Sequence, residues 1–472
     1  MRISISDTVP ATSRVITGMI VAMALIEALS GVTQGFLNPI LPALGPSLEI
    51  DDPTINGIFL ISNVSFAVLT PIISRLGDSF GYRLVLRVST LIVAAGVLLM
   101  ALVPTLLTVS IGVVMLTCVV GFVPLMMGIL RVTSPKDTRR GVSVMIGTLM
   151  IMVGFGGLLA GIAGAHDPVK GFWVGIPFAA LALVMTFVLP DAGVPSRDPI
   201  AVRPMMLCSL GLVGLVTALS MGPDWGWLDA RTLIIAVAGL ALLSWWVRID
   251  RRTGRQFINL RLLAEPRVRR ISLSTFFFGF ASISYFGTNG IFLHSDPSES
   301  GYGFGLNSLS IAVVLALASV LSLGSSLLTS RSLSTIGERN TLVLSGLILA
   351  GGFAAMGLGH ESLAGYCAGF ALFNIGLGIY QSATRALSVE GVRLEETASA
   401  AGLNELALSV GIALGAAVVK MLSSSFATGG RISMTGLVSI WTLLALAALA
   451  AAVIACGYTR APVLPNTEEA KA

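Results

Sequence analysis

Long apolar runs separated by short polar stretches make up almost all of the chain's 472 residues. Breaking the sequence at its charged and Pro/Gly-rich stretches leaves fourteen runs, most of them near the roughly 20 residues that a helix needs to cross a bilayer. They lie at 15–44, 55–75, 84–104, 106–130, 141–165, 169–190, 204–222, 232–248, 270–294, 306–329, 340–359, 363–385, 398–421 and 434–457. The pattern predicts an all-α integral membrane protein with fourteen transmembrane helices, and an even number of crossings leaves both termini on one side.

The lysines and arginines predict the orientation of these helices. Cytoplasmic loops of membrane proteins carry an excess of basic residues. With cytoplasmic termini, all but four of the 29 basic residues lie in cytoplasmic segments, the exceptions being Lys170, Arg231, Lys420 and Arg431. We therefore expect a multi-pass protein of a bacterial inner (plasma) membrane with both termini in the cytoplasm. The arginine-rich loop at 248–270 could bind anionic lipids, although such loops more often only orient the flanking helices.

Composition excludes several other classes of protein. With 55% hydrophobic and 11% charged residues and a mean hydropathy of +0.90, the chain is not a soluble globule. The net charge of +5 comes from arginines in short loops, so we expect no nucleic-acid partner. The four cysteines lie inside apolar runs without metal-ligand spacing. We find no catalytic constellation and expect no enzymatic activity, metal or cofactor; we expect a monomer in the lipid bilayer.

A charged turn, SRLGDSFGYRLVLR at 74–87, joins the second and third runs. Its order of Leu76, Asp78, Gly81 and Arg83 resembles the cytoplasmic loop motif of the major facilitator superfamily. In that family the loop latches the outward-open state, so the resemblance implies a conformational latch formed by Asp78, Gly81 and Arg83. An ordinary charged turn is the alternative. A second copy, SRSLSTIGERNT, has Ser334 in place of the aspartate and predicts a weaker latch.

The middle of the chain resembles one particular branch of this superfamily. A helix, an outer turn containing DWGW, a second helix and the stretch FINLRLLAEPRVRR resemble the fourteen-helix drug:proton antiporter branch of the superfamily. The resemblance implies the major facilitator fold, with two six-helix bundles plus two inserted helices. The expected domains are an N-terminal bundle at 1–190, a linker with the inserted helices at 191–269, a C-terminal bundle at 270–460 and a cytoplasmic tail at 461–472.

An acidic residue near the middle of the first run is the strongest functional pointer, because ionisable residues inside a membrane are costly unless they have a function or a partner. Glu27 shares a helical face with Ser30, Gly31, Gln34 and Asn38. We interpret Glu27 as a proton-coupling residue. A hydrogen-bonded Glu that only holds its helix to a neighbour is the alternative.

Two positions depart from the pattern of the family. Thr33 stands where an acidic residue is usual in the first helix, and Thr117 stands where the fourth helix usually has an arginine. The basic partner for proton exchange is therefore missing from its usual place. This departure favours a proton-independent facilitator, or an exporter of one specific metabolite, as the runner-up function.

The resemblance implies further site residues. A central substrate cavity would be lined by Gln34, Asn38, Thr117, Tyr285, Asn289, Asn374, Tyr380 and Gln381. Gly156, Gly157 and Gly161 resemble the glycine-spaced fifth-helix motif and imply a hinge or a leak seal between the halves, with small-residue packing as the alternative. Glu405 could pair with Arg385 or Arg393 as a gate, or could simply reach interfacial water.

These observations predict a secondary active transporter that works by alternating access. We expect it to export small amphipathic or cationic compounds, whether a drug, a toxin or a metabolite, by proton antiport. Its partners would be the small-molecule substrate and protons. A membrane sensor or scaffold that keeps the fold without transporting is the alternative from another class.

Overall fold

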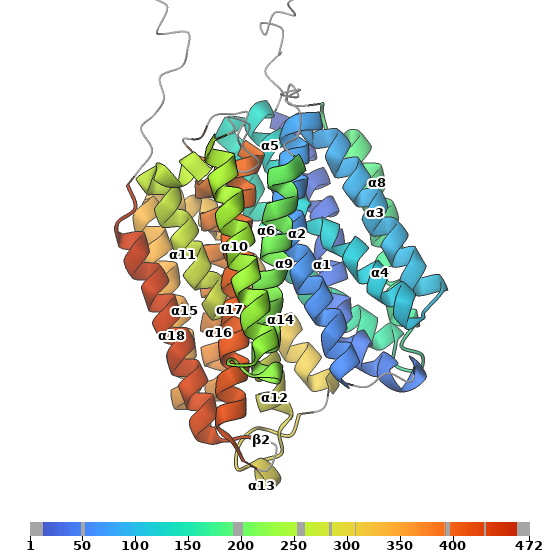
Figure 1. The fold of residues 1–472 in the computed structure, drawn as a ribbon, viewed down its shortest axis with the longest axis vertical. Coiled ribbons are helices and arrows are strands. Elements are labelled where there is room, and N and C mark those ends of the chain that lie inside the picture. Colours follow the sequence, from blue (N-terminus) through green and yellow to red (C-terminus); the bar gives the residue numbers. More distant parts are fainter. Residues whose placement is uncertain are drawn as a thin grey trace, which may run out of the picture.

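The computed structural model describes residues 13–48, 52–191, 202–252, 260–282, 286–306, 308–390, 392, 397–428 and 431–459. Over these residues the chain is a bundle of helices with one short pair of strands (Figure 1). The helices of the first part are α1 (Ser13–Leu48), α2 (Asp52–Phe80), α3 (Tyr82–Leu102), α4 (Leu106–Leu116), η2 (Thr117–Gly121), α5 (Phe122–Thr133), η3 (Pro135–Asp137), α6 (Thr138–Ala163), α7 (Lys170–Trp173), α8 (Gly175–Val188), α9 (Val202–Trp225) and α10 (Ala230–Arg252). The elements of the second part are η4 (Leu260–Ala264), α11 (Pro266–Ser282), α12 (Phe286–His294), α13 (Pro297–Ser300), α14 (Ser308–Thr335), α15 (Glu338–Gly359), α16 (Leu363–Ser388), α17 (Thr397–Ser425), β1 (Ala427–Thr428), β2 (Arg431–Ile432) and α18 (Met434–Cys456).

Twelve segments of the described residues are long and apolar enough to cross a membrane. Both helices of the expected inserted pair are among them, as Val202–Leu219 and Ala230–Ile249. Helix α2 matches one further predicted run, and α11 and α12 together match another, but these helices are not among the twelve. The all-helical membrane fold is confirmed, whereas the count of fourteen crossings stays a prediction.

The helices follow the predicted runs, with differences at some ends and more than one helix within some runs. Helix α2 continues past the predicted end at residue 75 to Phe80, because the glycine that follows it, and not the charged residues within it, ends the helix. The fourth run contains a 3₁₀ segment, Thr117–Gly121, between two α-helices. Hydropathy does not indicate this change, because an apolar segment can form either kind of helix.

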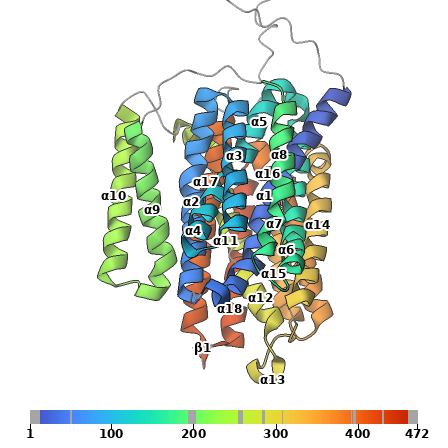
Figure 2. The same ribbon diagram turned by 90° about the vertical axis from the view of Figure 1, so that its right-hand side faces the viewer.

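Two halves of the bundle lie side by side, α1 to α8 on one side and α11 to α18 on the other (Figure 1). They meet where α2 contacts α17 and where α6 contacts α14. Small residues allow this approach, because a Cβ added at Gly402 or at Gly154 would lie only 2.4 Å from the Oγ of Ser74 or Ser319, respectively. The hairpin of α9 and α10 stands at the edge of the bundle (Figure 2), where α9 packs against α2 and α17 from opposite halves.

Helix α1 begins and α18 ends at the same end of the bundle, which we call the terminal end (Figure 1). Two equivalent turns lie there. Gly81 between α2 and α3 has φ of 95°, and Gly337 between α14 and α15 has φ of 86°. Residues with side chains rarely adopt these angles. Both copies of the motif therefore form the same turn, although the second lacks the aspartate.

Replacing Gly337 by alanine tests whether this turn needs glycine. Nothing lies within 4 Å of a Cβ at Gly337, so any loss of stability in this variant comes from the strained backbone angle alone. We expect a loss of about 1 kcal/mol, seen as a lower melting temperature of the purified protein in detergent. Gly324→Ala is the matched control, because that helical glycine also has open space around it. An equal loss in both variants would contradict this assignment.

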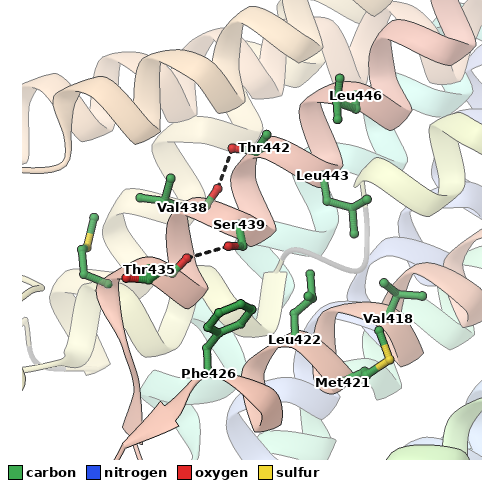
Figure 3. Close-up of a pocket in the computed structure, with 11 residues that line it drawn as sticks. Val418, Met421, Leu422, Phe426, Thr435, Val438, Ser439, Thr442, Leu443 and Leu446 are labelled. Carbon is green, nitrogen blue, oxygen red and sulfur yellow. Dashed lines mark hydrogen bonds between the residues drawn. The ribbon is translucent and has the colours of Figure 1, made fainter.

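An apolar groove of about 780 Å³ lies between the ends of α17 and α18 away from the terminal end (Figure 3). Two of its hydroxyl groups are satisfied within α18, since Ser439 Oγ donates to the Thr435 carbonyl and Thr442 Oγ1 to the Val438 carbonyl, both at 2.8 Å. The groove therefore offers an uncharged surface. Its lining contains none of the site residues expected from the sequence.

Candidate functional site

A buried ion pair joins α16 to α17. Arg385 Nη2 donates to Glu405 Oε2 at 2.9 Å, and Arg385 Nε lies 2.5 Å from Glu405 Oε1. Both side chains are only 8% exposed. Gln381, one turn earlier on α16, accepts a hydrogen bond from Arg385 Nη1 through its Oε1. The pairing expected for Glu405 is therefore present, whereas its role as a gate stays a prediction.

Glu27 extends this charged group into the other half of the protein. Its side chain is 1% exposed and hydrogen-bonds Ser30 one turn away on α1. Its Oε2 atom has no hydrogen-bond partner among the described residues. Glu27 interacts electrostatically with Arg385 and with Glu405. One buried site therefore combines a carboxyl from α1 with an ion pair from α16 and α17.

The stability of a buried charged group depends on every charge keeping its partner. Burying a charge away from water is costly, and a buried pair offsets that cost only when its geometry is good. Removing one partner of a buried pair typically destabilises a protein by about 3–5 kcal/mol, because the other charge is left uncompensated. An ionised Glu27 would therefore depend on Arg385, the cation that acts on it.

The residues of the expected latch lie at the terminal end of the N-terminal half. Asp78 is 5% exposed and accepts a hydrogen bond from Tyr82 Oη at 3.1 Å. Arg83 Nη2 donates to the carbonyl of Phe187 on α8 at 2.8 Å. Arg83 thus ties α3 to α8 within one half. Close to Asp78, α2 packs against α17 of the other half through Ser74 and Gly402.

Ion pairs across the terminal end connect the two halves, and the sequence did not reveal them. Arg139 at the start of α6 lies 2.6 Å from Glu390 by its Nε and also pairs with Glu338 at the start of α15. Arg267 on α11 lies 3.7 Å from the same Glu390 and donates to Tyr458 Oη at 2.8 Å. Burial raises the pKa of Tyr458, so the phenol stays neutral beside Arg267.

Arg131 makes a second connection at this end. From α5 it donates through Nη1 to Thr397 Oγ1 at 3.2 Å and through Nη2 to the carbonyl of Val392. From the sequence, Arg131 and Arg139 are interpreted only as basic residues that set the orientation of the membrane helices. Their partners lie in the other half of the chain, so no local spacing could have shown the contacts.

Four residues expected to line a cavity hold helices of the C-terminal half together. Tyr366 Oη donates to Asn289 Oδ1 at 2.7 Å, and Ser322 Oγ donates to the Asn374 carbonyl at 2.9 Å. Tyr380 stacks on Phe278 with ring centroids 4.5 Å apart, and its hydroxyl hydrogen-bonds Ser274. Gln381 binds Arg385 as described above. All four are buried here, and contact with a substrate stays a prediction.

The remaining cavity candidates are in the N-terminal half, apart from one on the C-terminal side. Gln34 is half-buried and donates to Ser30 Oγ at 3.0 Å. Thr117 is buried in η2 and donates to the Val114 carbonyl at 2.6 Å. The side chain of Asn38 and the whole of Tyr285 lie outside the described residues.

The glycines of the expected hinge differ from one another. A Cβ at Gly156 would lie 2.7 Å from Val32 Cα, and one at Gly157 would lie 3.1 Å from the carbonyl oxygen of Gly35. Both glycines therefore let α6 approach α1 within the same half. Gly161 has nothing within 4 Å of a Cβ. Close packing is thus visible at the first two positions, and the hinge stays a prediction.

Comparison with known proteins identifies the family of the chain. Residues 23–416 match the Major Facilitator Superfamily. The chain is 26% identical over 433 residues to a probable actinorhodin transporter of Streptomyces coelicolor, covering 86% of this chain and 71% of that protein. It is 27% identical over 314 residues to the tetracenomycin C resistance and export protein of Streptomyces glaucescens, covering 64% of this chain and 56% of that protein. The fold is similar to that of the human organic anion transporter MFSD10, with a TM-score of 0.65, 16% identity and coverage of 94% and 100%.

The family and the relatives of this chain are transporters and not enzymes. The chain belongs to the major facilitator superfamily, as its match over residues 23–416 shows. It is a multi-pass protein of the plasma membrane.

Proposed function

We propose that this protein exports small amphipathic or cationic compounds from the cytoplasm in exchange for protons. The observation that carries the proposal is the buried carboxyl of Glu27 beside the Arg385–Glu405 pair. A buried carboxyl that interacts with charges of the other half can link protonation to movement of the halves. The names of its relatives, an actinorhodin transporter and a tetracenomycin C exporter, support drug-like or metabolite-like substrates.

The proposal includes fourteen crossings with both termini in the cytoplasm. Helix α2 and the pair α11 and α12 would add two crossings to the twelve segments that meet the length and hydropathy criteria. The excess of basic residues at the terminal end supports its cytoplasmic position. The domains would then be the bundles at 1–190 and 270–460, the inserted pair at 191–269 and the tail at 461–472. A monomer suffices for this mechanism.

Alternating access would use the contacts at the terminal end. Arg139 and Arg131 join the halves there, and Ser74 packs on Gly402. We infer that this conformation is closed toward the cytoplasm. Asp78, Gly81 and Arg83 would hold the turn in the arrangement that permits closure. Release of these contacts would open the binding site to substrate from the cytoplasm.

The proton-independent facilitator is the second candidate function. It is favoured by Thr117, which is buried and uncharged where the family usually has a basic partner. The two candidates differ in one measurable property, since only the antiporter moves protons when its substrate is added.

Replacing Glu27 by glutamine tests the proposed function. Wild-type protein in liposomes with an imposed proton gradient and an internal pH dye should release protons when substrates from a panel of lipophilic cations and neutral drugs are added. The Glu27→Gln variant should lose this release almost completely, because the amide cannot carry the proton. Glu361→Gln is the matched control, since Glu361 is exposed. Substrate movement without proton movement in the wild type would establish the facilitator instead.

A further inference from the structure

Three ionisable side chains from both halves of the protein share one buried site. Glu27 comes from α1, Arg385 from α16 and Glu405 from α17, and their residues are 1%, 7% and 6% exposed, respectively. We call these three residues the triad. Ile26 next to Glu27 and Ala386 next to Arg385 are buried members of one hydrophobic cluster that includes residues of both halves. The triad is thus enclosed by protein at the meeting of the two halves.

The triad has two carboxyl groups for one guanidinium. With both carboxyls ionised it carries one net negative charge, and with one proton bound it is neutral. Burial in a medium of low polarity favours the neutral arrangement. Both oxygens of Glu405 contact Arg385, whereas Oε2 of Glu27 has no hydrogen-bond partner among the described residues. In this conformation the proton therefore belongs on Glu27, and Arg385 is committed to Glu405.

Arg385 is the one cation that acts on Glu27 among the described residues. The charged groups that act on Glu27 are Arg385 and Glu405. The charged residues with described side chains on α1 itself and on the helices packed against it stand at the helix ends: Arg14, Arg75, Asp78, Arg131, Arg139, Arg140 and Lys170. The buried Thr117, in the fourth run, offers no cation.

We propose that Arg385 is the cationic partner of Glu27 in proton exchange and that Glu405 competes with Glu27 for it. This inference rests on the proposed proton antiport and assigns two further residues to it. When Glu27 loses its proton, its carboxylate attracts Arg385 and draws α16 toward α1. When Glu27 is protonated, Arg385 returns to Glu405. One proton thereby switches an ion pair within the C-terminal half to one that spans both halves.

The proposal predicts opposite effects for the two new residues. Spin labels at Leu84 on α3 and Leu344 on α15, both exposed, would report the separation of the halves as pH is varied. The wild type should show a one-proton transition, and Glu27→Gln should abolish it. Glu405→Gln frees Arg385 for Glu27, so the midpoint should fall by about one pH unit or more. Arg385→Gln removes the cation, so the midpoint should rise by a similar amount.

Matched variants separate these effects from loss of structure. Arg385→Lys keeps the charge and should stay closer to the wild-type midpoint than Arg385→Gln. Arg339→Gln removes an exposed arginine of α15 and should change nothing. If Arg385→Gln does not fold, the proposal is tested by Glu405→Gln alone, in which the pH midpoint of the transition should fall. Suppose that Glu27→Gln abolishes the transition, but Glu405→Gln and Arg385→Gln shift its midpoint in the same direction or not at all. The proposed roles of Arg385 and Glu405 would then be wrong, while proton antiport through Glu27 would remain supported. A wild type without any proton coupling overturns the proposed antiport itself.

Discussion

The Gly402→Val substitution is expected to shift the protein out of the conformation described here. A Cβ at Gly402 would lie 2.4 Å from Ser74 Oγ and 2.7 Å from Ser74 Cβ, so α2 and α17 must move apart to admit it. Overpacking of this kind costs about 1–3 kcal/mol, enough to change the ratio of two conformations by roughly 5- to 150-fold. The distance between spin labels on Leu84 and Leu344 should therefore lengthen, and substrate export should fall sharply.

A compensating change at Ser74 distinguishes this steric effect from general damage. Gly402→Ala should produce a smaller shift, and adding Ser74→Gly should reverse most of it, since the side chain that obstructs the new methyl group is removed. Gly351→Ala is the control, because nothing lies within 4 Å of a Cβ there. If Ser74→Gly brings no recovery, the contact between α2 and α17 does not govern the closed state.

The fold was largely predictable because the length of an apolar run nearly determines what it can do in a bilayer. Runs near 20 residues become crossing helices, and the runs at 340–359 and 434–457 match α15 and α18 almost residue for residue. The break at Thr117–Gly121 could not be predicted, since an apolar segment can form either kind of helix. Helix ends were also missed where glycine, as at Gly81, decides them.

The site was predictable only where its residues are close in sequence. Arg385 and Glu405 flank one short loop, so their pairing followed from helices ending on the same side. The relation of Glu27 to that pair depends on how the halves dock, which hydropathy does not encode. The same holds for Arg139 and Glu390, whose contact joins positions 251 residues apart. Charges that only seemed to orient helices therefore include residues that join the halves.

The contacts between the halves lie at two levels of the bundle, and each level has a different role in the proposed mechanism. The triad of Glu27, Arg385 and Glu405 is deeply buried and would respond to protonation, whereas Arg139 and Arg131 lie at the terminal end and would respond to closure. Movement of α16 would affect both levels, because Arg385 lies near the end of this helix and Glu390 lies two residues beyond it. A change in proton occupancy can thus reach the terminal end through one helix.

Removing the charge of Arg139 is expected to weaken closure at the terminal end. The Arg139→Gln variant would leave Glu338, which is 7% exposed, without this cation and would free Glu390 from its bidentate contact. Arg139 itself is 26% exposed, so solvent screens part of the interaction. We expect a loss of about 1–3 kcal/mol for the closed conformation, and a longer distance between labels at Leu84 and Leu344.

The neighbouring arginine provides the control for this prediction. Arg140 is exposed and forms no ion pair among the described residues, so Arg140→Gln removes the same charge from the same turn of α6 without breaking a contact. High salt should lengthen the label distance in the wild type and have less effect on Arg139→Gln, because partly exposed ion pairs are screened. Equal shifts in the two variants would mean that net charge, and not the pairing of Arg139 with Glu338 and Glu390, holds the halves together. A shift confined to Arg139→Gln would instead show that this arginine couples α6 to the movement of α15 and α16.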